Sequence, residues 1–422
     1  MNSEQIIEEL RLENPWWEDK GPDLPEKAVE REMEDKIYSE LQEDMITGLI
    51  GLRRTGKTTL LKMIIEKLLK DVDPIRICYF SFELAEEIKI RNLINTYSEE
   101  ILKEPYGSYD KKVYFLFDEI QKVDDWGDHL KSVQDRNFNI KFLITGSSSM
   151  NITKGAGESL VGRIKIHRLN PFTFKEFLHY EGIKAPDMMI DDLNYPKDAA
   201  RYRIKFKEYM DKGGFPELYN TRSKNYLKQI LDLIFFRDIV EIFPVKRTDV
   251  LKGIFKRISE KSGQRINFTS LANDLNTQFR TVKDYIQYLS DSFLIEKSIS
   301  LEKDHIKAMR KNPKVYVSDH SFANLYGTQE GLKAETVAFN HLRTIEQPRY
   351  NKEPEVDIVL PEEKNAFEIK YSSKVDKRDA KNMLKLPEEY SLFLVTKERY
   401  DEWTVEGRKV RLVPLWLLTL CI

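Results

Sequence analysis

The sequence predicts an α/β fold built on a parallel sheet, and three observations support this prediction. Short apolar runs alternate with segments of helical periodicity along the first part of the chain. A glycine-containing loop, residues 51–59, stands between one such run (45–50) and a helical pattern. A later apolar run, 113–117, ends in the acids Asp118 and Glu119. Loops and acids at strand ends are expected along the carboxyl edge of an open parallel sheet, where ligands bind.

Length and composition limit the classes of protein that the chain can belong to. Its 422 residues are enough for about two to four domains, and 41% hydrophobic with 33% charged residues is typical of a soluble globular protein. A net charge of −2 means that any DNA contact needs a local basic face. Cys78 and Cys421 have no partners at zinc-site spacing, and the N-terminus has no apolar signal segment, so we expect a reducing, cytoplasmic setting and no membrane partner.

The loop predicts a polyphosphate site. Glycines admit backbone conformations that a Cβ would obstruct, and the N-terminus of the following helix adds unpaired N–H groups and partial positive charge. We expect Lys57 to reach the β- and γ-phosphates of ATP and Thr58 to ligate Mg²⁺. The alternative is a glycine-containing turn before a core helix. The expected nucleotide-binding residues are Gly51, Leu52, Arg53, Arg54, Thr55, Gly56, Lys57, Thr58 and Thr59.

Polar residues after two further strands complete this predicted site. We expect Asp118 to hold Mg²⁺, directly or through water, and Glu119 to polarise the attacking water. A solvated strand end would explain the two acids taken alone. Hydroxyls in 145–149 reach the same sheet edge, and Ser147 is our candidate sensor of the γ-phosphate, with an ordinary polar loop as the alternative. Arg163 is either an arginine finger, acting in cis or in trans, or a surface arginine.

Several segments, in this order, resemble the archaeal-type AAA+ ATPases, which are P-loop enzymes akin to the signal-transducing STAND NTPases. They are NPWW from Asn14, GLRRTGKTT, FLFDE, ITGSSS, LVGR and RLNPFTFKEFL. The resemblance covers almost the whole chain. The NPWW motif and the Pro-rich stretch through Pro25 predict an irregular N-terminal arm (1–30) whose aromatics pack on the ATPase body. Given the helical, charged pattern of 179–245, the resemblance implies an ATPase core (31–178) and a helical lid (179–245). It also implies that Pro216, in a Gly-Gly-Phe-Pro-Glu segment, lies near the nucleotide, and it allows a homo-oligomer.

Residues 246–305 resemble a winged helix. Two short helices are expected, and the second would bury one apolar face, made of Val282, Tyr285, Ile286 and Leu289. The opposite face is only mildly basic and would expose Gln278, Arg280, Lys283 and Asp284. DNA binding and packing within the molecule are both consistent with this pattern.

The C-terminal part, 306–422, resembles the PD-(D/E)xK nuclease core, which implies a restriction-endonuclease-like α/β domain. Because side chains alternate along a strand, Glu368 and Lys370 face the same side, and hairpin pairing brings Asp357 beside them. Glu335, on the preceding helix, matches the extra acid of many members. Carboxylates make an oxygen site for Mg²⁺, and Lys370 is placed to orient or deprotonate a water. Alternating charges on a half-exposed hairpin are the simpler explanation.

Two functional hypotheses follow. In the first, the chain is an ATP-binding ATPase that acts on DNA, with a Mg²⁺-dependent nuclease-like domain. In the second, ATP and ADP drive a regulatory switch, and the C-terminal domain binds nucleic acid without cutting it. Both hypotheses allow DNA contacts through the winged helix and the C-terminal domain.

Overall fold

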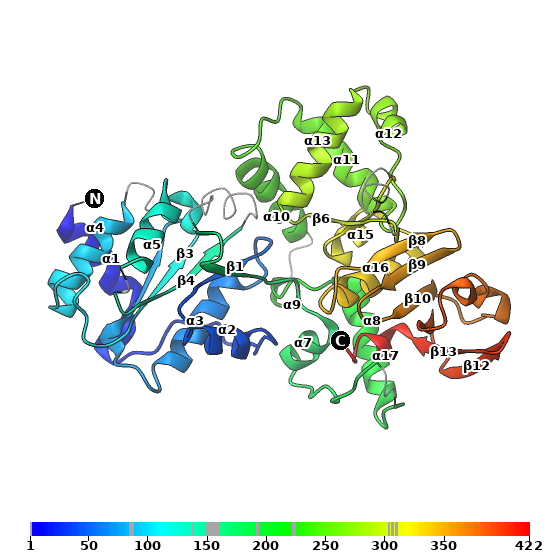
Figure 1. The fold of residues 1–422 in the computed structure, drawn as a ribbon, viewed down its shortest axis with the longest axis horizontal. Helices are drawn as coiled ribbons and strands as arrows, with labels where there is room; N and C mark the ends of the chain where they lie inside the picture. The colour runs from blue at the N-terminus through cyan, green and yellow to red at the C-terminus, as the bar shows by residue number, and fades with distance from the viewer. Residues whose placement is uncertain are drawn as a thin grey trace. The chain divides into compact units, whose positions relative to one another are not determined.

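The computed structural model describes residues 2–83, 88–136, 138–147, 160–190, 194–221, 225–302, 304, 308 and 311–422. The chain forms two compact units, Met1–Asn170 and Pro171–Ile422 (Figure 1). The first unit ends before the boundary expected at residue 178. The segments predicted as lid, winged helix and nuclease-like domain all belong to the second unit. No helix in the described ranges is long and apolar enough to span a membrane.

The first unit contains a five-stranded sheet in the order β2-β3-β4-β1-β5. Every neighbouring pair is parallel, which confirms the predicted sheet. Because β4 lies between β1 and β3, the residues that follow these three strands meet at one edge. The strands are β1 (Ile46–Ile50), β2 (Ile77–Ser81), β3 (Val113–Asp118), β4 (Ile140–Gly146) and β5 (Ile164–Arg168).

Helices cover both faces of this sheet (Figure 1). On one face, α2 (Glu34–Glu40) and α3 (Lys57–Leu68) bury apolar side chains such as Ile37 and Leu61 against the strands. The other face carries contacting aromatic rings of Phe115, Phe117 and Phe142. The remaining helical segments are η2 (Pro74–Arg76), α4 (Ile90–Thr96), the π-helical turn η3 (Tyr97–Leu102), η4 (Ile120–Lys122) and α5 (Trp126–Gln134).

The N-terminal arm is more regular than predicted. It contains α1 (Ser3–Glu13), whose first turn is closed by a capping box, and the short helix η1 (Pro15–Glu18). The expectation of an irregular arm was therefore wrong. The side-chain amide of Asn14 bonds both backbone groups of Tyr79, at 2.6 and 2.8 Å, so it pairs with the edge strand β2 as a strand would. Both arm tryptophans also donate to β2, which confirms that the aromatics pack on this unit.

The second unit begins with helices and a two-stranded hairpin. The predicted apolar face of α13 is buried, and α13 packs on α11 and α12 (Figure 1). The hairpin pairs β6 (Ile295–Ser298) with β7 (Lys314–Val317). The helices are α7 (Phe174–Tyr180), α8 (Ala199–Lys212), α9 (Glu217–Asn220), α10 (Tyr226–Leu233), the π-helical turn η6 (Ile234–Ile239), α11 (Thr248–Glu260), α12 (Phe268–Asp274) and α13 (Phe279–Asp291).

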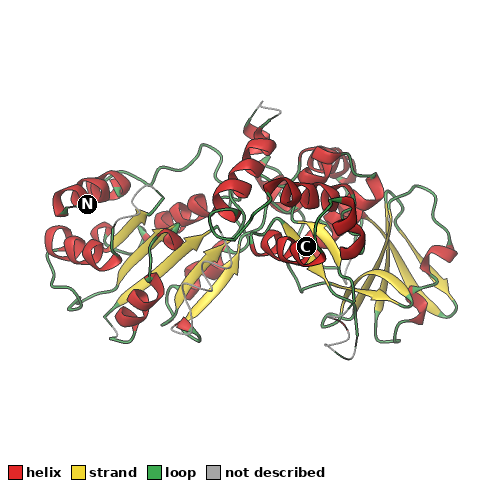
Figure 2. Cartoon of the chain, turned by 90° about the horizontal axis from the view of Figure 1, so that it is seen from above, coloured by secondary structure: helices red, strands yellow, loops and turns green. Residues whose placement is uncertain are grey.

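A mixed six-stranded sheet completes the second unit, in the order β12-β13-β11-β10-β9-β8. Figure 2 draws its strands in yellow. The pair β9–β10 is antiparallel, whereas β10–β11 and β11–β13 are parallel. The strands are β8 (Arg349–Lys352), β9 (Glu355–Leu360), β10 (Asn365–Lys370), β11 (Ser391–Thr396), β12 (Asp401–Val405) and β13 (Arg408–Pro414).

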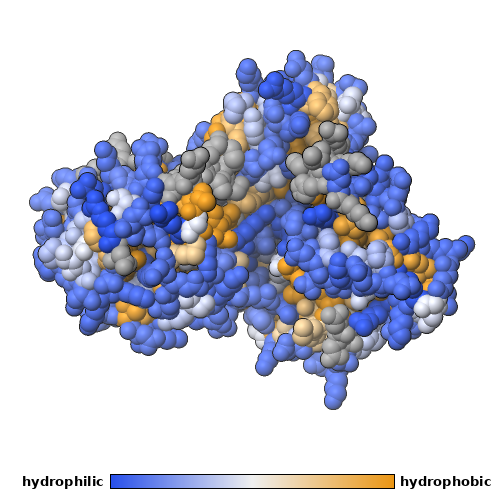
Figure 3. Space-filling view, in the orientation of Figure 1, coloured by the Kyte–Doolittle hydropathy of each residue, from blue (hydrophilic) through white to orange (hydrophobic). Residues whose placement is uncertain are grey.

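Short helices surround this second sheet. Of these, α16 (Glu330–Leu342) contacts β10 and β7. Two 3-10 turns, η7 (Lys377–Ala380) and η8 (Met383–Lys385), contact β10. The others are α15 (His320–Tyr326) and α17 (Leu415–Leu418). Most of the surface visible in Figure 3 is hydrophilic, with apolar side chains confined to smaller patches.

Candidate functional site

The phosphate loop joins β1 to α3 at the carboxyl edge of the first sheet. Gly51 passes so close to β5 that a Cβ there would lie 2.3 Å from the carbonyl oxygen of Leu169. Gly56 adopts φ 98°, a conformation that glycine tolerates best. The Lys57 ammonium is buried and donates to the carbonyl oxygens of Gly51 (2.9 Å) and Leu52 (3.2 Å), so it lies across the loop. The two glycines therefore permit the path of this loop, and the lysine closes it from within.

Asp118 ends β3 beside this loop and is surrounded by hydroxyl donors. Thr58 Oγ1 donates to its carboxylate at 2.6 Å, Tyr79 at 3.3 Å, and Thr145 Oγ1 donates to the other oxygen. Burial, with the neighbouring Glu119 charge, raises the pKa of Asp118, and the Thr145 and Thr58 hydroxyls oppose this rise. The two predicted Mg²⁺ ligands, Thr58 and Asp118, are thus in direct contact.

Glu119 and Ser147 are connected through a residue that the sequence did not single out. The Glu119 backbone N–H donates to Thr145 Oγ1 at 3.1 Å. Gln121 Nε2 donates to the Glu119 carboxylate and to Ser147 Oγ, the latter at 3.2 Å. Ser147 therefore reaches the acids through Gln121, whereas Thr145 touches Asp118 directly. The neighbouring Ser148 and Ser149 lie outside the described residues.

Two arginines of this unit have positions that the sequence did not predict. Arg31, from the segment before α2, is buried and donates to the carbonyl oxygens of Thr55 (2.9 Å) and Asn170 (2.7 Å), so it braces the phosphate loop. Arg163 lies at the opposite edge of the sheet, because its carbonyl oxygen accepts the N–H of Ile46 at the start of β1. Its guanidinium pairs with Asp135 at 3.1 Å and stays 41% exposed.

The other predicted loop residues differ in exposure. Arg53 forms an ion pair with Glu83 at 3.6 Å, and Thr55 Oγ1 donates to the Leu52 carbonyl oxygen at 2.9 Å. Arg54 is exposed and adopts φ 66°, and Thr59 is half-buried on the first turn of α3.

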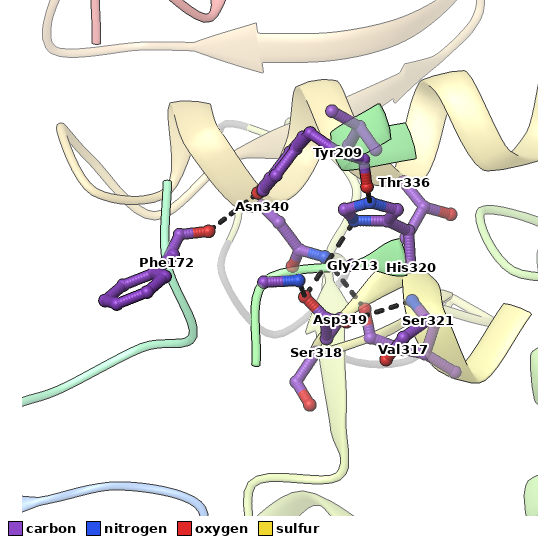
Figure 4. Close-up of polar contacts among 12 residues, drawn as sticks. Phe172, Tyr209, Gly213, Val317, Ser318, Asp319, His320, Ser321, Thr336 and Asn340 are labelled. Atoms are coloured by element: carbon purple, nitrogen blue, oxygen red, sulfur yellow. Dashed lines mark hydrogen bonds and ion pairs between the residues drawn. The ribbon is translucent and has the colours of Figure 1, made fainter. Parts of the chain in front are cut away.

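Pro216 belongs to the second unit, and the segment before it is held inside that unit (Figure 4). The Gly214 N–H donates to Asp319 Oδ2 at 2.9 Å, and the Ser321 N–H donates to Asp319 Oδ1 at the same distance. A Cβ on Gly214 would lie 2.6 Å from the Phe172 carbonyl oxygen. The glycines of this segment therefore allow close packing around a buried aspartate, and a role of Pro216 at the nucleotide stays a prediction.

The second unit brings together the four residues predicted for a C-terminal site. The β9–β10 register pairs Ile358 with Phe367, so the next pair places Asp357 opposite Glu368. Asp357 Oδ2 accepts the Ile369 N–H at 3.1 Å, and Lys370 Nζ lies 2.8 Å from Glu368 Oε1. Burial, together with the Asp357 charge, raises the pKa values of both Glu335 and Glu368 to about 7. Both shifts express the cost of placing several carboxylates in one buried region.

A lysine that the sequence did not single out lies among these acids. Lys314 Nζ, at the start of β7, is 2.8 Å from Glu335 Oε1 and 2.8 Å from Asp357 Oδ1. Tyr316 also donates to Glu335 Oε1, at 2.7 Å. Within the described ranges, no three His, Cys, Asp or Glu side chains are arranged to hold a metal ion. The predicted Mg²⁺ ligands are close together, but their present arrangement favours an ammonium group.

A cavity of about 730 Å³ opens beside this cluster. Its lining includes Lys314, Glu335 and Asp357 together with basic and amide side chains from the α11–α12 connection, the segment before β7 and the β8–β9 hairpin. These other residues include Gln264, Arg265, Lys311, Asn312 and Lys352.

Comparison with known families identifies the first site. Residues 43–178 match the family model of an AAA domain, a range that includes the phosphate loop, Asp118, Glu119 and the first turns of α7. This part of the chain is thus similar to an AAA domain. Residues 203–333 match a family described as a domain of unknown function (DUF8612).

Relatives extend over nearly the whole chain. An uncharacterized protein of Haemophilus influenzae is 24% identical, covering 89% of this chain and 94% of the relative. An uncharacterized protein of Methanocaldococcus jannaschii is 28% identical, covering 92% and 90% respectively. Among solved structures, AMPPCP-bound DnaA from Aquifex aeolicus has a TM-score of 0.29 and 16% identity, covering 62% of this chain and 89% of that one. This score is too low to carry an inference.

Proposed function

We propose that the chain hydrolyses ATP with Mg²⁺ and uses the reaction to act on DNA. The contact between Thr58 and Asp118, beside the Lys57 ammonium, is the observation that carries this proposal. A hydroxyl and a carboxylate held together beside a phosphate loop are the protein groups that Mg·ATP needs. Bound Mg²⁺ would neutralise charge that develops on the β- and γ-phosphates.

The chain's own residues have distinct roles in this proposal. Lys57 would exchange its two carbonyl partners for phosphate oxygens, and the loop N–H groups would bind the remaining phosphate oxygens. Glu119 would accept the proton of the attacking water, and Gln121 would orient its carboxylate. Thr145, in β4, donates to the Asp118 carboxylate and accepts the Glu119 backbone N–H, so it would transmit the loss of the γ-phosphate to β4. Ser147 keeps its predicted sensing role through Gln121.

The proposed action on DNA is supported by features of the second unit. Helix α13 and its N-cap expose Gln278, Arg280 and Lys283. The order of α11, α12, α13 and the β6–β7 pair supports the proposed winged helix. Lysine and arginine side chains also line the cavity beside the acidic cluster, where they would attract phosphodiester groups. The proposal includes a Mg²⁺-dependent nuclease-like domain at residues 306–422. Its support is that Asp357, Glu368 and Lys370 lie close together on two neighbouring strands.

A regulatory switch is the second candidate, and the Lys314 bridge favours it. Because Lys314 already pairs with both Glu335 and Asp357, the C-terminal domain could bind nucleic acid without cutting it. Hydrolysis would then alter the packing of the domains and not drive cleavage.

Mg·ATP hydrolysis by the full chain, with and without linear DNA, tests the proposal. We expect measurable turnover that DNA stimulates, loss of nucleotide binding in Lys57→Ala, and binding without turnover in Glu119→Gln. Tight Mg·ATP binding by Lys57→Ala would contradict the site assignment. Slow turnover that ignores DNA would favour the switch.

Cleavage of labelled linear, circular and branched DNA tests the nuclease-like part. The comparison is between wild type and Asp357→Ala, in Mg²⁺ or Mn²⁺, with and without ATP. Cleavage by wild type alone is the expected result, and no cleavage by either protein would favour the switch.

A further inference from the structure

The lysine between the acids is buried as deeply as the acids themselves. Lys314 has a side chain that is 6% exposed, compared with 10% for Glu335 and 16% for Asp357. Removing one partner of a buried ion pair leaves an uncompensated charge, which is costly. The single ammonium therefore stabilises two carboxylates that would otherwise repel each other in this region.

We propose that Lys314 occupies the position of a divalent cation, and that metal binds this site only after the ammonium has left. The inference rests on the C-terminal site proposed above and concerns its regulation. One ammonium holds one oxygen of Glu335 and one of Asp357 at 2.8 Å each. A metal ion would need those same two oxygens.

The third acid supplies an independent observation. Glu368 Oε2 is buried and has no hydrogen-bond partner within the described parts of the chain, while its other oxygen pairs with Lys370. A buried acceptor without a donor is uncommon and points to a missing ligand. A metal ion in place of the Lys314 ammonium would be bound by Asp357 and would also give the unpaired oxygen of Glu368 a partner.

Displacing the ammonium requires movement of the side chain alone. The backbone around Lys314 is fixed, because the Ile266 N–H donates to the Pro313 carbonyl oxygen at 3.0 Å and the Gly263 N–H to that of Val315 at 2.9 Å. The adjoining cavity, which Lys314 itself lines, gives the side chain room. The cavity is lined by basic side chains, such as Arg265 and Lys311, and by acids, which include Glu355. A phosphodiester entering beside the basic side chains would supply a new anion for the ammonium. Nucleic acid and metal would therefore favour each other's binding.

Mn²⁺ titration of the full chain without nucleotide tests the proposal. We expect Lys314→Met to bind Mn²⁺ at least about tenfold more tightly than wild type, a difference of about 1.4 kcal/mol. Adding Asp357→Asn should abolish this gain, which would place the ion at the cluster. Lys311→Met is the matched control, since it removes another lysine of the cavity wall that pairs with Glu302, and its affinity should equal that of wild type. Equal Mn²⁺ affinity in Lys314→Met and wild type would overturn the proposal.

A second measurement needs no substitution, in case Lys314→Met does not fold. A short phosphorothioate duplex should raise the Mn²⁺ affinity of wild type several-fold, and no change would overturn the proposal. Cleavage is scored separately. Tighter Mn²⁺ binding by Lys314→Met with no DNA cleavage by any variant would end the nuclease proposal and leave this inference standing.

Discussion

The two acidic sites of this chain hold their aspartates by different means. In the first unit, Asp118 is bonded by the neutral hydroxyls of Thr58, Thr145 and Tyr79. In the second, Asp357 is bonded by the charged ammonium of Lys314. Hydroxyl donors orient a carboxylate and leave its negative charge available, whereas an ammonium cancels the charge. The first site is thus prepared for a cation, and the second already contains one.

The largest expected difference between the sites is in ATP hydrolysis. Asp118→Asn should lower Mg·ATP turnover by roughly 100-fold or more, because the loss of a metal-holding charge removes several kcal/mol of stabilisation. Asp357→Asn should leave turnover near the wild-type rate. The measurement is the steady-state rate of phosphate release by the two variants and wild type. A comparable loss of turnover in Asp357→Asn would show that the two sites are coupled, which would contradict the view that only the first site serves ATP hydrolysis.

The next difference is in stability, and two tyrosines provide a matched pair. Tyr316→Phe should cost about 1–3 kcal/mol, because Glu335 loses a donor in a region with few others. Tyr79→Phe should cost less than about 1 kcal/mol, since Asp118 keeps both threonine hydroxyls. Denaturant unfolding of both variants gives the two values. Equal costs would mean that the donors around Asp118 are not redundant.

The sequence predicted the first site more completely than the second. Gly51, Lys57 and Thr58 are neighbours in one loop, and Asp118 ends a strand, so local pattern was enough to place them. The meeting of Asp357 with Glu368 followed from strand alternation and a hairpin. Lys314 could not be predicted, because it reaches the acids from a different hairpin. No local pattern marks such a residue.

The N-terminal arm and the Gly-Gly-Phe-Pro-Glu segment show a related limit. Helix α1 was missed although Asn2 and Gln5 form its capping box, because the Pro-rich stretch after it suggested irregular structure. The role of Asn14 depends on the edge strand β2, which lies far along the sequence. The sequence also gave no sign that Gly213 and Gly214 pack on Asp319, which lies about a hundred residues further along the chain. Short-range patterns could not predict these distant contacts.

A smaller difference between the units should appear in their pH dependence. Burial raises the pKa of Glu13, near Asp118, to about 7 from an ordinary 4.5, so the folded first unit binds a proton more tightly and loses stability as pH rises from about 4.5 to about 7. Burial lowers the pKa of His341, in the second unit, to about 3 from 6.5. The folded second unit therefore binds a proton less tightly than the unfolded chain does, and it loses stability as pH falls below about 6.5. Thermal unfolding of Glu13→Gln should show a flatter profile between pH 5 and 7, while the control Glu8→Gln, at an exposed position of the same helix, should follow wild type. An unchanged profile in Glu13→Gln would remove Glu13 as the source.

The smallest expected effect concerns Arg163. Its ion pair with Asp135 is exposed, so Arg163→Ala should change the free energy of unfolding by less than about 1 kcal/mol. Because Arg163 lies at the edge of the sheet opposite the phosphate loop, an effect on hydrolysis would have to come from a second copy of the chain. The measurement is specific ATPase activity as a function of protein concentration. If wild-type activity rises with concentration and that of Arg163→Ala does not, Arg163 acts in trans. Parallel curves would leave it a surface arginine.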